Sequence, residues 1–133
     1  MIGLDTNVVL RLLLSDDPAQ KMRAAKCIQQ AKRLDTRIII TLAVVFEMEW
    51  VLRNSAKMNK AQVLGVFNLL LASCDIEIDN EKILEQALHI YENSSSDFAE
   101  CLFLAQYQRM GCDTMLTFDT KAARMTGVEL VAG

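Results

Sequence analysis

Apolar residues along the chain form short runs that alternate with longer segments in which they recur every three or four positions. The short runs are rich in β-branched residues or alternate with polar ones, which is typical of strands. The longer segments have the spacing of helices with one buried face. We expect strands near residues 1–4, 37–41, 76–78, 114–118 and 128–131. We expect helices near residues 7–14, 17–33, 42–57, 60–73, 81–93, 98–110 and 120–125.

Polar residues and glycines at the ends of these segments supply helix start and stop signals. Asp16 or Asp17 can cap the second helix, and Pro18 fits its first turn because the missing N–H has no partner there. Other caps are expected at Thr41, Asn59, Asn80, Gly111 and Gly127.

The alternation of strand and helix predicts an α/β fold, with a parallel sheet of four or five strands and helices on both faces. The chain has 133 residues, of which 52% are hydrophobic, enough for one compact core. One proline and five glycines are too few for a long linker. We therefore expect a single domain over residues 1–133.

Ligands of such a sheet bind outside the carboxyl ends of its strands, and two aspartates are expected there. Asp5 directly follows the first strand, and Asp119 follows the strand near 114–118. Either residue can instead be an N-cap with no chemical role. The position alone does not choose between these interpretations.

Two further acidic positions lie on helices. Glu47 has apolar neighbours three and four positions away, so we expect it on a buried face, where a carboxylate needs a partner. Glu49 has Arg53 four residues on and is expected to be a solvated surface pair. Asp97 and Glu100 share one face of a helix start and also fit a capping box, which is the simpler interpretation for them alone.

Carboxylates gathered at one edge of a sheet repel each other unless a cation joins them. Oxygen ligands without cysteine or histidine favour Mg²⁺ or Mn²⁺. Such an ion can activate a water and neutralise charge on a phosphodiester. A zinc site is not expected, because the four cysteines form no CxxC pair and His89 is the one histidine. Glycine-rich phosphate loops of the GxGxxG and GxxxxGK types are absent.

The net charge of −3 argues against a protein that coats nucleic acid by charge alone. Four basic residues near the acids can hold phosphates or can be ordinary solvated surface: Arg11, Arg53, Lys121 and Arg124. No apolar run is long enough to span a membrane, and the first residues lack the basic region of a signal peptide. We interpret the cysteines as buried and reduced, and expect a cytoplasmic protein.

Several segments together resemble the PIN-domain family, in particular the VapC-type ribonuclease toxins of bacterial and archaeal toxin–antitoxin pairs. These segments are "MIGLDTNVVLRLL", "FEMEWVL", "DFAECLFLAQYQRMGC" and "TFDTKAAR". The combination of "LDTN" near the start with "TFDTKAAR" near the end is fairly specific. The resemblance implies a three-layer α/β/α sandwich and a magnesium-dependent endoribonuclease that acts on RNA. It also implies a homodimer and neutralisation by a partner antitoxin.

The resemblance also implies roles for individual residues. Asp5 matches the family's first acid, Glu47 the second and Asp119 the last. Polar supporting positions beside these acids are Thr6, Asn7 and Thr117. They are expected to orient a carboxylate or a metal-bound water.

The third acid departs from the family pattern. Glu100 stands where the family has an aspartate, and its side chain is longer by a methylene. Either Glu100 still binds the metal or Asp97 takes its place. We expect Asp5 and this third acid to hold Mg²⁺ or Mn²⁺, with Glu47 and Asp119 binding through water or completing a second metal position.

Two other functions remain open at this point. One is a non-catalytic PIN-like module for binding or oligomerisation, in which the acids are only caps; the Glu100 substitution keeps it open. The other is an aspartate-dependent phosphotransfer protein. Phosphatases of the haloacid-dehalogenase type have an aspartate two residues after the first one, and this chain has Asn7 there.

Overall fold

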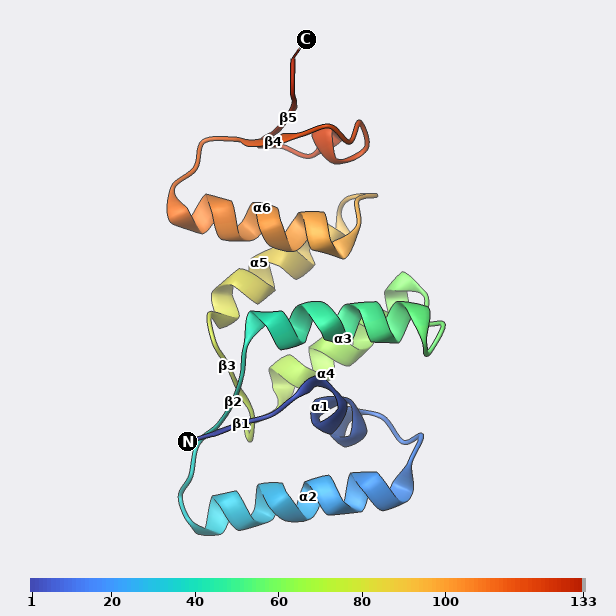
Figure 1. The fold of residues 1–133 in the computed structure, drawn as a ribbon, viewed down its shortest axis with the longest axis vertical. Helices are drawn as coiled ribbons and strands as arrows, with labels where there is room; N and C mark the ends of the chain where they lie inside the picture. Colours follow the sequence, from blue (N-terminus) through green and yellow to red (C-terminus); the bar gives the residue numbers. More distant parts are fainter. Residues whose placement is uncertain (133) are drawn as a thin grey trace. The chain divides into compact units, whose positions relative to one another are not determined.

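The computed structural model describes residues 1–132 and contains two compact units, Met1–Asp79 and a second one that begins at Asn80. We call them the N-terminal unit and the C-terminal unit (Figure 1). The elements of the N-terminal unit are β1 (Ile2–Gly3), α1 (Thr6–Leu13), α2 (Pro18–Arg33), β2 (Ile38–Ile40), α3 (Leu42–Asn54), α4 (Lys60–Ala72) and β3 (Glu77–Ile78). Those of the C-terminal unit are α5 (Glu81–Glu92), α6 (Phe98–Met110), β4 (Met115–Thr117), the 3₁₀ helix η1 (Ala122–Arg124) and β5 (Val128–Leu130).

The N-terminal unit contains a parallel sheet in the strand order β1-β2-β3 (Figure 1). β2 is the central strand, and its Ile38 and Ile40 are buried, as expected for a β-branched run with neighbours on both sides. The register pairs Ile2 with Ile38, Gly3 with Ile39, Ile39 with Glu77 and Ile40 with Ile78. Because the strands are parallel, Asp5 and Thr41, which follow β1 and β2, lie toward the same edge of the sheet.

Side-chain caps fix the starts of all four helices in this unit. The predicted caps Asp17 and Thr41 accept hydrogen bonds from the backbone N–H groups three residues on, and Pro18 is the first residue of α2. Asn59 forms a full capping box with Gln62, each side chain accepting from the other residue's backbone N–H. Each such cap stabilises a helix by about 1 kcal/mol.

α3 buries a carboxylate that the sequence places on the surface. The predicted pair of Glu49 and Arg53 is confirmed, with Nε 2.9 Å from Oε2 and Nη2 3.3 Å from Oε1. The expectation that Glu49 is solvated is wrong, because its side chain is only 5% exposed while that of Arg53 is 49% exposed. It lies on the face of α3 that also buries Val45, Met48 and Leu52. The two-pronged bond to Arg53 compensates the cost of burying this charge.

Replacing Arg53 with Met is expected to lower the free energy of unfolding by about 2 kcal/mol, because Glu49 then stays buried without its cation. The matched control is Arg37→Met. Arg37 and Glu77 form the same Nε–Oε2 contact at 2.9 Å, but their side chains are 63% and 47% exposed. The control is expected to lose at most about 1 kcal/mol. Urea unfolding measures both, and equal losses would show that burial of Glu49 adds nothing.

The C-terminal unit packs α5 against α6 and adds a two-stranded parallel sheet of β4 and β5 (Figure 1). Tyr91 and Phe98 meet edge to face with their ring centroids 5.5 Å apart, and both are buried. The predicted cap at Gly111 is confirmed, with φ 93° at the end of α6. The predicted cap at Gly127 is not, because Met125 is the C-cap of η1 and Gly127 lies further on, before β5, with φ 88°. The expected helix near 120–125 is a short 3₁₀ helix.

The predicted α/β class with parallel strands is confirmed, and the five strands form one sheet of three and one of two in residues 1–132. The prediction of a single domain over residues 1–133 remains a prediction. The cysteines are free, as expected, but the expectation that they are buried holds only for Cys101. Cys27, Cys74 and Cys112 are exposed. No helix within residues 1–132 combines the length and the hydropathy needed to cross a membrane.

Candidate functional site

Asp5 lies between β1 and α1, where the chain leaves the carboxyl end of a strand. Its Oδ1 accepts a hydrogen bond from the backbone N–H of Val8 at 3.2 Å, so the capping interpretation is confirmed. The cap uses Oδ1, so Oδ2 is not involved in capping, and Asp5 is exposed to solvent. Capping and metal binding are therefore compatible in this residue.

A cavity of about 360 Å³ lies beside Asp5, between α1 and α2. Asn7, Arg11, Gln20 and Arg23 contribute polar groups to its wall. Asn7 is exposed, whereas the neighbouring Thr6 is buried, at 4% exposure. Of these two supporting positions, Asn7 is therefore the one that solvent and ligands can reach.

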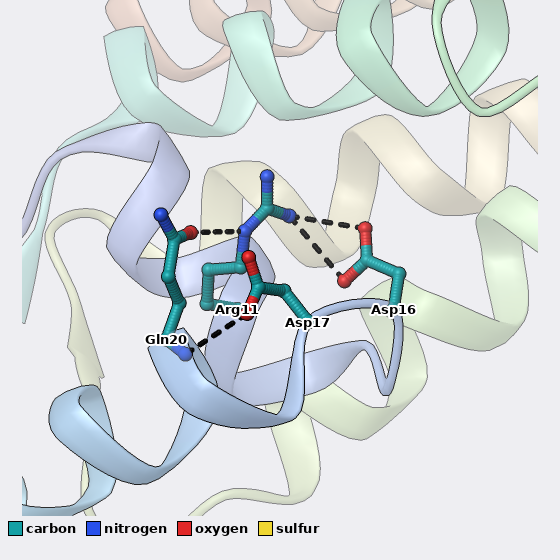
Figure 2. Close-up of polar contacts among 4 residues, drawn as sticks. All are labelled: Arg11, Asp16, Asp17 and Gln20. Atoms are coloured by element: carbon teal, nitrogen blue, oxygen red, sulfur yellow. Dashed lines mark hydrogen bonds and ion pairs between the residues drawn. The ribbon is translucent and has the colours of Figure 1, made fainter.

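Arg11 is held in a fixed position at this cavity (Figure 2). Its Nε donates to Oε1 of Gln20 at 2.7 Å, and its Nη1 lies 3.1 Å from Oδ2 of Asp16. Gln20 is itself fixed through its backbone N–H, which donates to Oδ1 of Asp17 at 3.0 Å. The Asp16 carboxylate offsets the charge of Arg11, which weakens its candidacy as a phosphate ligand.

Glu47 lies on α3, but the expectation that it is buried is wrong. Its side chain is exposed, as is Ala43 one turn earlier, while Val44 and Val51 are only half-buried. The buried face of α3 is the one with Val45, Met48, Glu49 and Leu52. Glu47 thus needs no partner for its own stability, and its carboxylate is open to a ligand.

Asp97 and Glu100 lie at the start of α6, in the C-terminal unit. Asp97 is the N-cap residue by position, but its side chain makes no capping hydrogen bond, so the expected capping box is not formed. Asp97 is exposed and Glu100 is half-buried. The capping box, which is the simplest explanation for this pair, therefore does not account for the two carboxylates.

Asp119 follows β4 and shapes the turn into η1. Its Oδ1 accepts hydrogen bonds from the backbone N–H groups of Lys121 at 2.8 Å and Ala122 at 3.4 Å. Its own N–H donates to Oγ1 of Thr117 at 3.0 Å, so Thr117 fixes the backbone that carries this acid. Ser96, one residue before Asp97, donates from Oγ to the carbonyl of Lys121 at 3.5 Å. The two acid-bearing segments of this unit are thus in contact.

The acids divide between the units: Asp5 and Glu47 in the N-terminal unit, and Asp97, Glu100 and Asp119 in the C-terminal unit. Within residues 1–132, no three histidine, cysteine, aspartate or glutamate side chains come close enough together to hold a metal ion. The chemistry of this donor set, carboxylate oxygens without thiolates or imidazoles, nevertheless suits Mg²⁺ or Mn²⁺.

The other three basic candidates, Arg53, Lys121 and Arg124, differ in their surroundings. Arg53 is held by the buried Glu49, which argues against the phosphate-binding interpretation of this residue. Lys121 and Arg124 instead line a second cavity of about 490 Å³, together with His89 and the serines at 94–96. This cavity was not predicted from the sequence. Its sequence signal is a histidine near the end of a helix, then three serines, with two basic residues after a later strand.

Comparison with known proteins gives one family. A family model described as the PIN domain matches residues 2–128. No curated protein matches the chain.

Proposed function

Since this chain belongs to the PIN domain family, whose members are generally nucleases, we propose that it is a metal-dependent endoribonuclease. We propose further that it is the toxin of a type II toxin–antitoxin pair. The observation that carries the proposal is that one family model spans both units and includes all five candidate acids. The resemblance of "LDTN" and "TFDTKAAR" to VapC-type toxins supports the narrower role.

We assign the metal ligands by sequence order within the family pattern. Asp5 and the third acid, Glu100 or Asp97, would hold Mg²⁺ or Mn²⁺, while Glu47 and Asp119 would act through water or at a second metal position. The ion, when bound, would supply an activated water and neutralise charge on the phosphodiester. Asp5 and Asp119 support this assignment, because each uses Oδ1 in local backbone hydrogen bonds that orient the carboxylate. Thr117 would keep Asp119 in place.

The assembly proposals follow from the same family. We propose a single PIN domain over residues 1–133, a homodimer, and a cognate antitoxin as protein partner, in the cytoplasm. The single family match across residues 2–128 supports the single domain. Partner and location rest on the resemblance to toxin ribonucleases.

The direct test is cleavage of a mixed RNA pool by purified, antitoxin-free protein. We expect cleavage with Mg²⁺ or Mn²⁺ and none with EDTA, because the proposed water is activated by the ion. Circular dichroism in EDTA should show a folded protein, so that the loss is one of chemistry. A folded protein that cuts no RNA with either metal would favour the non-catalytic module. Cleavage that persists in EDTA would contradict the metal.

A further inference from the structure

We propose that the 490 Å³ cavity of the C-terminal unit binds phosphate groups of the RNA strand next to the cleaved bond. This inference rests on the proposed ribonuclease function and adds a substrate-binding site to it. The cavity lies between the last turn of α5, the serine segment 94–96, α6 and the segment around η1. Its volume falls in the range of sites that hold a small ligand.

The lining of this cavity has the chemistry of an anion site. Lys121, Arg124 and His89 supply N–H groups, and hydroxyl and amide groups come from Ser94, Ser95, Ser96, Thr126, Asn93 and Gln108. No aspartate or glutamate is among the lining residues. A cavity that offers cations and neutral polar groups without a carboxylate attracts phosphate and disfavours a metal cation.

The two cations of the cavity are not committed to other charges. Within residues 1–132, neither the Lys121 nor the Arg124 side chain forms an ion pair, whereas Arg11 is paired with Asp16 and Arg53 with Glu49. Of the four basic residues near the acids, these two are therefore the ones with charge available for a ligand. They also share one cavity, which allows them to act on the same stretch of backbone.

Local hydrogen bonds hold the walls of the cavity together. The side-chain Nδ2 of Asn93 donates to the backbone carbonyl of His89 at 2.9 Å. It also lies 3.5 Å from Nδ1 of the His89 ring. The Asn93 backbone N–H also bonds the carbonyls of His89 and Ile90. These bonds fix the last turn of α5, which forms part of the cavity wall. The Ser96 hydroxyl ties the serine segment to the backbone of Lys121.

The cavity also borders the proposed acids of this unit. Ser96 directly precedes Asp97, and Lys121 comes two residues after Asp119, with its N–H bonded to that carboxylate. A group of carboxylates repels an RNA backbone, so a neighbouring basic cavity is needed to hold the strand against that repulsion. One phosphate in the cavity would leave an adjacent stretch of the strand beside the acids.

The test compares two double variants with the same loss of charge. Lys121→Gln/Arg124→Gln removes the cations of the cavity. The hydrogen bonds that Lys121 forms with Asp119 and Ser96 involve only its backbone, so the substitution leaves them in place. The control is Lys82→Gln/Arg109→Gln, two exposed residues of the same unit that do not line the cavity. Binding of a labelled single-stranded RNA is measured by fluorescence anisotropy in EDTA, over a range of salt concentrations. Cleavage by the same proteins is measured with Mg²⁺.

We expect the cavity variant to bind RNA roughly tenfold more weakly and to lower the salt slope of log K by about 1.4, near 0.7 for each lost phosphate contact on a single strand. The control should keep the slope of the wild type. In the cleavage assay the cavity variant should raise KM and leave kcat within about twofold.

The outcomes separate this inference from the proposed function. Equal losses in the two double variants would overturn the phosphate site, because net charge alone would then explain them. Unchanged affinity and KM in the cavity variant of an active nuclease would overturn it as well. If the wild type cuts no RNA, the nuclease proposal fails on that result, while the binding comparison in EDTA still decides whether the cavity holds RNA.

Discussion

Replacing Asp5 with Asn is expected to reduce RNA cleavage at least about a hundredfold while leaving the protein folded. The substitution removes the negative charge that we assign to the metal and keeps the size of the side chain. Losing a metal ligand costs several kcal/mol of transition-state stabilisation, and about 3 kcal/mol corresponds to a hundredfold in rate. Asn is as good an N-cap as Asp, so the bond to the Val8 N–H is retained and the free energy of unfolding should change little.

The matched control for this variant is Asp17→Asn. Asp17 caps α2 as Asp5 caps α1, each accepting a hydrogen bond from the backbone N–H three residues on. The two substitutions thus make the same local change in one unit, and Asp17 has no proposed chemical role. Initial cleavage rates and thermal unfolding are measured for both. If the two variants keep equal activity, Asp5 is only a cap and its assignment to the metal fails.

The helices of this protein were predictable because their signals are local. Asp17, Thr41 and Asn59 each cap a helix by bonding an N–H three residues away, so a short stretch of sequence contains both partners. α2 also ends at Arg33, where its pattern ends. Asp97 shows the limit of such signals, because it fits the capping-box pattern and makes no capping bond.

The prediction that Glu47 is buried and Glu49 is solvated was wrong for a different physical reason. Consecutive residues of a helix point about 100° apart, so adjacent positions can face core and solvent. α3 carries apolar residues on every side, including the exposed Phe46 and Trp50. The pattern then contains no polar face to mark the outside. Only packing against other elements determines that Glu49 is buried and Glu47 is exposed.

The sequence did not distinguish among the four basic residues near the acids, for a related reason. Arg11 and Arg53 pair with carboxylates that are close in sequence, Asp16 just beyond the end of α1 and Glu49 one helical turn earlier in α3. Lys121 and Arg124 meet His89 in a cavity formed by residues more than 30 positions apart. Proximity to an acid in the sequence therefore selects the paired residues Arg11 and Arg53 together with Lys121 and Arg124, and does not separate the two groups.

The third acid gives the second large effect, and we expect Glu100→Gln to reduce cleavage about a hundredfold or more. We assign Glu100 to the family position for this ligand by resemblance, and the substitution removes its charge while keeping its length. Asp97→Asn, one helical turn away, is the matched comparison and should lose less than about tenfold. Both residues lie at the start of α6, Asp97 as the N-cap residue without a capping bond and Glu100 in the first turn. Each substitution therefore loses a similar favourable interaction with the helix dipole, about 0.3–1 kcal/mol. Their difference in activity therefore reports on chemistry rather than on stability.

Glu100→Asp completes this comparison because it retains the charge and shortens the side chain by one methylene. If Glu100 binds the metal, the aspartate variant should keep cleavage within about tenfold of the wild type, since the family's own residue then stands at this position. Single-turnover rates with Mg²⁺, together with thermal unfolding, measure all three variants. A large loss in Asp97→Asn with little change in Glu100→Gln would transfer the ligand to Asp97. Small losses in both would place the start of α6 outside the metal site.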